Sequence, residues 1–190
     1  MNTLQNLTYQ PQTIESADPV ARPILEQAKK SMGMVPNMYA GMATNPALLD
    51  AYTHAYNSFR QHAGFTPQEQ EVIFMSISYE NGCEYCLAAH SFIADRMSKV
   101  PTEVTDAIRN NTEVPDAKLG ALSRFSKAFI AKRGRPSEED VEAFLSAGYN
   151  ERHVAGVVAA AGVKTMSNYY NHVFETPLDD AFASRAWKQQ

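Results

Sequence analysis

The chain has 190 residues, of which 44% are hydrophobic and 20% are charged, the composition of an ordinary globular domain. Its 17 basic and 21 acidic side chains give a net charge of −4 and are well mixed, so no basic block favours nucleic acid as a partner. The longest run without a polar side chain, Val154 to Val163, is too short to span a bilayer, and we expect no membrane partner. The first residues do not form a secretory signal pattern, which makes the cytoplasm the expected location.

Apolar residues recur at helical spacing through nearly the whole chain, and no alternating pattern predicts a strand. The expected fold class is therefore all-α, with one helical domain over residues 19–176. We expect an irregular arm over residues 1–18 and a C-terminal extension over residues 177–190, which packs on the body through Phe182 and Trp187 or extends to a neighbouring subunit. Within the domain we predict a short helix after Pro36 and helices over residues 19–32, 46–62, 67–79, 83 to just before Pro101, 102–109, 116–132, 136–147 and 150–174.

The helix predicted from Pro67 has a well-formed start. Thr66 is suited to cap it, proline takes the first helical position, and Glu69 can return a hydrogen bond to the cap. Asn81 and Gly82 then predict a turn. The helices on either side of this turn should form an antiparallel hairpin.

The two cysteines of the chain form a Cys83-x-x-Cys86 pair just after this turn, and His90 follows four residues later. Because each helical residue turns the chain by about 100°, Cys86 and His90 share one face and Cys83 lies within roughly 20° of His90. We expect Cys83 in the first helical turn, where unpaired backbone N–H groups and the helix dipole stabilise a thiolate. Two thiols at this spacing can close a disulfide and open it again.

Glu71 lies twelve residues before Cys83, on the other arm of the hairpin. If the turn centres near Asn81, Glu71 and His90 are nearly level along the two helices, and the carboxylate can bond the imidazole. We expect burial in the surrounding apolar stretch to raise the pKa of Glu71 and to suit it to proton transfer near neutral pH.

These residues predict a thiol-dependent peroxidase that needs no cofactor and no metal. A thiolate attacks a hydroperoxide and becomes a sulfenic acid, which the second thiol converts to a disulfide with release of water. An external dithiol then reduces the disulfide by exchange. Two other interpretations of the cysteines remain open, a zinc site completed by His90 and His62 and a pair of inert buried thiols.

The spacing from Glu71 through Cys83-x-x-Cys86 to His90 resembles the signature of the alkylhydroperoxidase D family, within the wider carboxymuconolactone decarboxylase-like superfamily. The resemblance extends over roughly residues 33–180. Four further segments resemble peroxidase-related members of that superfamily: Gly33 to Tyr39, Asn45 to Leu49, Asn168 to His172 and Thr176 to Asp179.

The resemblance implies an all-helical, AhpD-like fold and a homo-oligomer. It also implies that Cys86 attacks the peroxide, that Cys83 resolves the sulfenic acid, and that Glu71 and His90 relay protons. The helix-terminus argument alone would favour Cys83 as the attacking thiol. In the best-known members a histidine precedes the second cysteine, where this chain has Tyr85. The reductant that the resemblance suggests is a lipoyl-type dithiol, and a thioredoxin-type one is the alternative.

Tyr85 either lines the pocket or packs in the core. His172, Asn168 and Asn171 lie on the last long helix, where they could reach the site or form a solvated or subunit-facing side. Two alternative functions follow from the same residues. The superfamily resemblance permits a lactone decarboxylase, which would have no use for a dithiol, and the cysteine pair permits a non-catalytic helical module that senses redox state.

Overall fold

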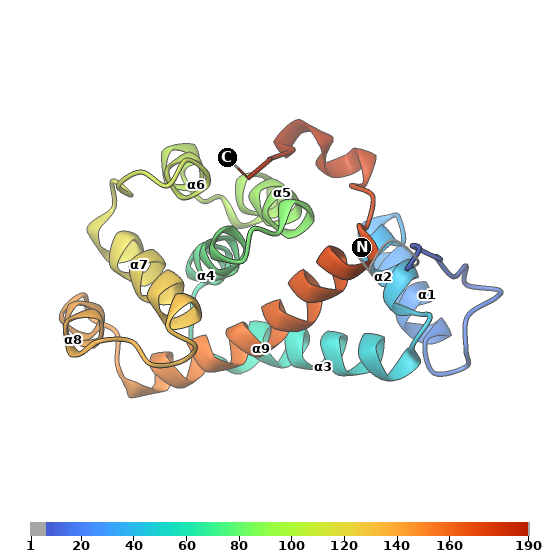
Figure 1. Ribbon diagram of the computed structural model, residues 1–190, viewed down its shortest axis with the longest axis horizontal. Helices are drawn as coiled ribbons and strands as arrows, with labels where there is room; N and C mark the ends of the chain where they lie inside the picture. Colours follow the sequence, from blue (N-terminus) through green and yellow to red (C-terminus); the bar gives the residue numbers. More distant parts are fainter. Residues whose placement is uncertain (1–6, 190) are drawn as a thin grey trace, which may run out of the picture.

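A hairpin of two helices lies at the centre of the computed structural model, which describes residues 7–189 (Figure 1). Helix α4 (Pro67–Glu80) is buried along most of its length, and α5 (Glu84–Ile93) returns against it after a turn at Asn81 and Gly82. Helices α7 (Ala117–Ala131) and α9 (Glu151–Phe174) also pack against α4. The part of the predicted arm over residues 1–6 lies outside the described residues.

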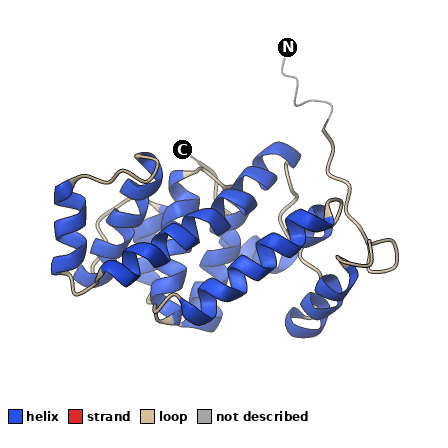
Figure 2. Ribbon diagram, turned by 90° about the horizontal axis from the view of Figure 1, so that it is seen from below, coloured by secondary structure: helices blue, strands red, loops and turns tan. Residues whose placement is uncertain are grey.

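The remaining elements surround this hairpin at its two sides (Figure 1). Helix α3 packs along α9, with α1 and α2 at one end of the molecule and α6 and α8 at the other. Their bounds are α1 (Arg22–Met32), α2 (Asn37–Met42), α3 (Pro46–His62), the π-helical turn η2 (Ala94–Ser98), α6 (Thr102–Arg109), α8 (Glu138–Ser146) and the 3₁₀ turn η3 (Asp180–Arg185). All regular structure from residue 7 to residue 189 is helical, which confirms the all-α prediction (Figure 2). None of these helices combines the length and the apolar character that a membrane span requires.

Capping residues set several of the helix starts. The capping box predicted for α4 is confirmed, with the Thr66 hydroxyl accepting from the Glu69 N–H and the Glu69 carboxylate accepting from the Thr66 N–H. Ser137 and Asp140 make the same reciprocal pair at α8, so that helix begins after Ser137 and not at Pro136. The capping box of Thr66 and Glu69 thus fixes the start of α4, at the end of the hairpin away from the cysteines.

Two further predicted helices differ from the observed ones. The first begins at Arg22 and not at Pro19, because the Asp18 carboxylate accepts the Val20 N–H at 2.8 Å and holds a turn there. The helix that carries the cysteines begins at Glu84 and ends as an α-helix at Ile93, after which a single π-helical turn continues to Ser98.

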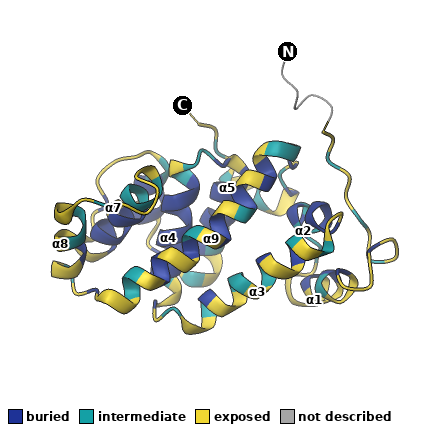
Figure 3. Cartoon of the chain, turned by 60° about the horizontal axis from the view of Figure 1, so that its bottom comes forward, coloured by how far each residue is buried: buried dark blue, intermediate teal, exposed yellow. Residues whose placement is uncertain are grey.

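The core follows the hairpin and its neighbours, whereas α3 and α8 expose their outer faces (Figure 3). Its largest fully buried side chains include Phe74, Phe125 and Phe144, and the two last stack at 4.2 Å between ring centroids. Two charged side chains, Glu71 on α4 and Lys164 on α9, are as completely buried as these rings. A charge in this position points to a function other than packing.

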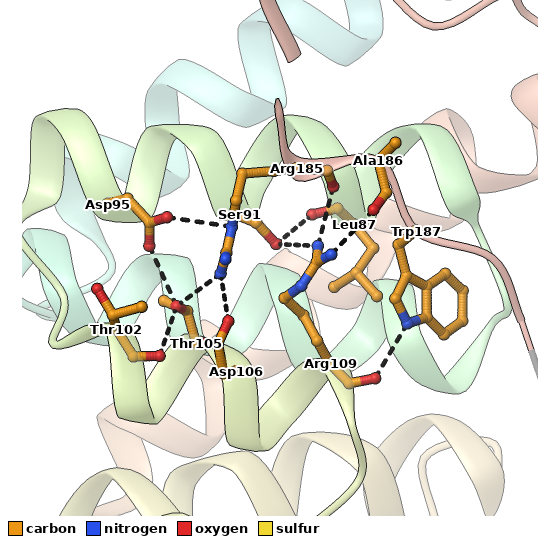
Figure 4. Close-up of polar contacts among 10 residues, drawn as sticks. All are labelled: Leu87, Ser91, Asp95, Thr102, Thr105, Asp106, Arg109, Arg185, Ala186 and Trp187. Atoms are coloured by element: carbon orange, nitrogen blue, oxygen red, sulfur yellow. Dashed lines mark hydrogen bonds and ion pairs between the residues drawn. The ribbon is translucent and has the colours of Figure 1, made fainter. Parts of the chain in front are cut away.

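The C-terminal segment runs back over α5, η2 and α6 and is held there by polar contacts, which we call the C-terminal clamp (Figure 4). Arg185 forms ion pairs with Asp95 and Asp106. Arg109 donates to the carbonyl oxygens of Arg185 and Ala186, both at 3.0 Å. The indole N–H of Trp187 donates to the Arg109 carbonyl, and the rings of Phe182 and Phe92 lie 5.6 Å apart. In this structure the extension over residues 177–189 therefore packs on its own chain.

Candidate active site

The two cysteines lie at the start of α5, both buried and unbridged. Cys83 is the N-cap residue of the helix, with extended backbone, and Cys86 occupies its first turn. The prediction that Cys83 lies within the first turn was therefore wrong. Gly82 adopts a positive φ of 68° and extends the turn, so that the helix begins one residue after Cys83.

The Asn171 amide and the Cys83 thiol are hydrogen-bond partners of the Cys86 sulfur. The Asn171 amide nitrogen lies 3.2 Å from Cys86 Sγ and 3.8 Å from Cys83 Sγ. The hydrogen bond with Cys86 is the largest cause that raises the pKa of the Cys83 thiol, and burial raises it further. Burial alone would raise the pKa of Cys86 as well, but the Cys83 hydrogen bond and the positive charge of Lys164 outweigh it and lower that pKa. These influences favour Cys86 over Cys83 as the ionised sulfur of the pair.

His90 and Glu71 meet across the hairpin, as their spacing predicts. His90 Nδ1 lies 2.8 Å from Glu71 Oε2, and both side chains are buried. With Nδ1 facing a carboxylate, the imidazole keeps Nε2 for proton exchange. The His90 ring packs 4.8 Å from the Phe74 ring, which fixes its position.

Arg60 on α3 completes this cluster and was not anticipated from the sequence. Its Nη2 lies 2.5 Å from the other carboxylate oxygen of Glu71 and also donates to the Tyr56 hydroxyl. Burial raises the pKa of Glu71, but the hydrogen bond and charge of His90 together with Arg60 outweigh burial and lower it. The expectation of a raised pKa was wrong, because it left out the arginine. With its lowered pKa, Glu71 is ionised at neutral pH and contacts both Arg60 and His90.

Burial also lowers the pKa of His90, and the nearby charge of Lys164 lowers it further, against the opposing influence of Glu71. The imidazole is therefore neutral at neutral pH. An imidazolium formed here would give up its proton readily.

Tyr85 has a structural role, because its hydroxyl is hydrogen-bonded to groups other than the two sulfurs. Its hydroxyl donates to Asp179 at 2.5 Å and accepts from the Met38 N–H at 3.3 Å, and burial raises its pKa. Asp179 also accepts a hydrogen bond from the Asn37 N–H, so its carboxylate satisfies a backbone donor at the start of α2. In this way Tyr85 links α5 to α2 and to the C-terminal segment.

A hollow of about 310 Å³ opens beside Cys83, lined by Gly82, Cys83, Glu84, Tyr85, Asn171, His172, Glu175 and Thr176. His172 is exposed at this mouth and stacks with Tyr169, with 6.3 Å between ring centroids. Asn168 instead accepts a hydrogen bond from Asn81 at 2.8 Å. Of the three polar residues considered on the last helix, Asn171 contacts the cysteines, and the Cys83 side of the pair faces the mouth.

The sequence pattern held a signal for Lys164 that was not used. A lysine three residues before Ser167 and seven before Asn171 shares their helix face, and all three are buried. Arg60 had no comparable signal, since it lies near the end of an amphipathic helix where a basic residue is ordinary.

Within residues 7–189 no three His, Cys, Asp or Glu side chains are placed to hold a metal ion. His62, considered as a fourth zinc ligand, lines a different groove between α3 and α9.

Residues 46–122 match the model of the carboxymuconolactone decarboxylase family. This stretch includes α3, the hairpin and both cysteines. This match covers less than half of the chain and supports the resemblance to the carboxymuconolactone decarboxylase-like superfamily over that stretch. No curated protein matches this chain.

Solved structures show how widely the fold of this chain is shared. A peroxidase-related protein from Ralstonia eutropha, described as an alkylhydroperoxidase AhpD core, aligns with a TM-score of 0.82 at 22% identity over 93% of this chain and 94% of that one. A peroxidase-related protein from Silicibacter aligns at 0.78 and 22% identity over 97% and 98%. The debrominase Bmp8, as a cysteine-to-alanine variant with 2,3,4-tribromopyrrole, aligns at 0.79 and 19% over 95% and 96%. At these identities the likeness is one of fold, and it supports the AhpD-like architecture.

Proposed function

We propose that the protein is a thiol-dependent peroxidase that reduces hydrogen peroxide or small organic hydroperoxides through a Cys83–Cys86 dithiol and disulfide cycle. The observation that carries this proposal is that the two sulfurs differ in pKa, in hydrogen bonding and in position. Cys86 has a lowered pKa and a hydrogen-bond donor in Asn171, whereas Cys83 keeps its proton and lies at the mouth. A nucleophile and a resolving thiol need this difference.

The reaction balances with the groups present. The Cys86 thiolate attacks the terminal oxygen of the hydroperoxide, the O–O bond breaks, and the leaving alkoxide takes one proton. Cys83 then attacks the sulfenic acid, an S–S bond forms, and the hydroxyl leaves as water. The Cys83 thiol supplies one of the two protons and solvent supplies the other. An external dithiol returns both electrons by exchange.

We assign delivery of the solvent proton to His90, since its lowered pKa makes the imidazolium a ready donor. Glu71, paired with Arg60, would hold the imidazole through Nδ1 and remain ionised throughout. The lipoyl-type or thioredoxin-type reductant, the homo-oligomer and the cytoplasmic location stay predictions.

The test is a stopped-flow titration of the reduced protein with hydrogen peroxide and cumene hydroperoxide, with free thiols counted before and after. We expect two thiols per chain to disappear together. Cys83→Ser should accumulate a sulfenic acid that can be trapped, and Cys86→Ser should not react. Survival of both thiols in a large peroxide excess would overturn the proposal.

Two competing activities belong in the same experiment. The likeness in fold to the debrominase Bmp8 makes 2,3,4-tribromopyrrole the second substrate to test, because a thiolate pair also suits a reductive reaction. The family name makes a carboxymuconolactone the third. Lactone turnover that persists in Cys86→Ser would favour the decarboxylase, since that reaction needs no dithiol.

A further inference from the structure

Lys164 on α9 is fully buried, and its ammonium nitrogen has neither a hydrogen-bond partner nor an ion-pair partner among residues 7–189. Charged side chains are almost never buried in this way without a partner, because removal from water costs several kcal/mol. A buried cation without a paired anion depends for its stability on the negative charges that lie in the same buried region.

The surroundings of Lys164 place it at the thiol site. Its Nζ lies 5.4 Å from the centre of the Phe74 ring, and that ring lies 4.8 Å from the His90 ring. Asn171, two turns further along the same buried face of α9, contacts Cys86 Sγ. Lys164 and Asn171 therefore lie on one buried face of α9: Lys164 packs on Phe74, which in turn packs on His90, and Asn171 contacts the sulfurs.

The charges of the site leave one possible counter-ion. Glu71 is already neutralised by Arg60 at 2.5 Å. His90 carries no charge at neutral pH, and Cys83 keeps its proton. The groups that remain are the Lys164 ammonium and the Cys86 thiolate, which have opposite signs.

We propose that Lys164 is the buried counter-ion of the Cys86 thiolate and that it thereby favours the dithiol form of the protein over the disulfide. The effect on the sulfurs has the required sign, because the charge of Lys164 lowers the pKa of both Cys86 and Cys83. Lys164 acts through Cys86, so it is a positioning residue and not one that touches substrate. The inference uses the reactive thiolate of the proposed function but does not need peroxide turnover.

The redox consequence follows from charge alone. Closing the Cys83–Cys86 disulfide removes the thiolate and leaves Lys164 as a buried cation without an anion. This penalty falls only on the oxidised state, so it shifts the equilibrium toward the dithiol and raises the reduction potential. A disulfide with a raised reduction potential is easily reduced again, and a mild dithiol suffices as the electron donor.

The test compares Lys164→Met with Lys127→Met. Methionine keeps the length of the side chain and removes the charge. Lys127 is a partly buried lysine on α7 that contacts Asn111 and Tyr79, away from the sulfurs, so its replacement changes the net charge equally. Two quantities are measured on each protein: the ultraviolet absorbance of thiolate against pH, and the dithiol to disulfide ratio in glutathione buffers.

In Lys164→Met we expect the apparent pKa of Cys86 to rise by about one unit. At pH values below that pKa, the fraction of Cys86 present as thiolate should then be roughly tenfold smaller. The redox equilibrium should move toward the disulfide by about tenfold, equivalent to about 30 mV. Lys127→Met should change neither quantity. Unchanged values in Lys164→Met would overturn the proposal.

Other titratable groups around Lys164 do not blur this measurement. Burial raises the pKa of Tyr39, Tyr52 and Tyr56, so these tyrosines ionise above the thiolate window. Lys164→Met leaves in place the other charged and titratable groups that surround the site: Tyr39 on α2, Tyr52, Tyr56 and Arg60 on α3, Glu71 on α4, Cys83 at the start of α5, and Tyr85, Cys86 and His90 on α5.

If Lys164→Met does not fold, the wild-type protein still decides the question. With isotope-labelled lysine, the Lys164 side-chain signal should shift strongly when the disulfide forms, whereas that of Lys127 should not. Equal signals in both redox states would overturn the proposal. Peroxide turnover is a separate reading: if the wild type does not consume peroxide but the thiolate pKa still depends on Lys164, the proposed function fails and this inference stands.

Discussion

Two groups of charged side chains on either side of α5 use charge in different ways. In the C-terminal clamp, Arg185 faces Asp95 and Asp106 at the edge of solvent, and the spare donors of Arg109 end on carbonyl oxygens (Figure 4). At the thiol site the charges are buried, and Lys164 has no fixed partner among the described residues. Charged groups that all have partners stabilise the fold. A buried charge without a partner raises the free energy of the folded protein, and a reaction that changes the charges nearby can draw on that free energy.

The largest effect is expected where a buried pair is broken. Glu71→Gln leaves the Arg60 guanidinium without its carboxylate, and we expect the free energy of unfolding to fall by about 3 kcal/mol, as measured by urea denaturation of the reduced protein. The double variant Arg60→Met with Glu71→Gln should recover part of this loss. A single variant as stable as the wild type would mean that water reaches the pair.

The same variant predicts a pH dependence. The pKa of Glu71 lies below its ordinary value of 4.5 in the folded protein, so its contribution to stability is present above that value and is lost as the pH falls through the folded pKa. The difference in unfolding free energy between the wild type and Glu71→Gln should therefore be complete near neutral pH and shrink on acidification. A difference that grew toward low pH would contradict this assignment.

Tyr85 connects the two regions, and its replacement should have an intermediate effect. Tyr85→Phe removes the hydroxyl between the Met38 N–H and Asp179, leaving both buried groups with one partner fewer, and we expect a loss of about 2 kcal/mol in unfolding free energy. Tyr39→Phe is the control, since it removes a hydroxyl from a partly buried tyrosine that packs against the same core. The thiolate pKa should stay unchanged in both, and a large shift in Tyr85→Phe would give this residue a part in the chemistry.

Arg185→Met tests the clamp alone. Because its two ion pairs are partly exposed, we expect a loss of only about 1 kcal/mol in unfolding free energy, with the thiolate titration unchanged. Lys188→Met, at an exposed lysine of the same segment, is the control and should have no effect. A changed thiol titration in Arg185→Met would show that the clamp controls the site.

The sequence was sufficient where local rules decide the structure. Helical spacing, the Thr66 capping box and the Asn81-Gly82 turn predicted the central hairpin and placed Glu71 level with His90. It was insufficient where distant elements meet. Arg60 and Lys164 reach the site from α3 and α9, and neither the pKa of Glu71 nor the ionised thiol could be predicted without them. The Cys83 position failed for a smaller reason, a turn longer by one residue.

The smallest expected effect is a difference between the clamp and the thiol site in their response to salt. Exposed ion pairs are screened when the ionic strength rises from about 0.1 M to about 1 M, whereas buried charges are screened much less. The stability difference between the wild type and Arg185→Met should therefore shrink by about 0.5 kcal/mol at high salt. The difference in Cys86 pKa between the wild type and Lys164→Met should stay constant over the same range, because no solvent ions reach that pair. A salt-dependent pKa difference would place Lys164 in contact with water and remove the reason for its effect on the disulfide.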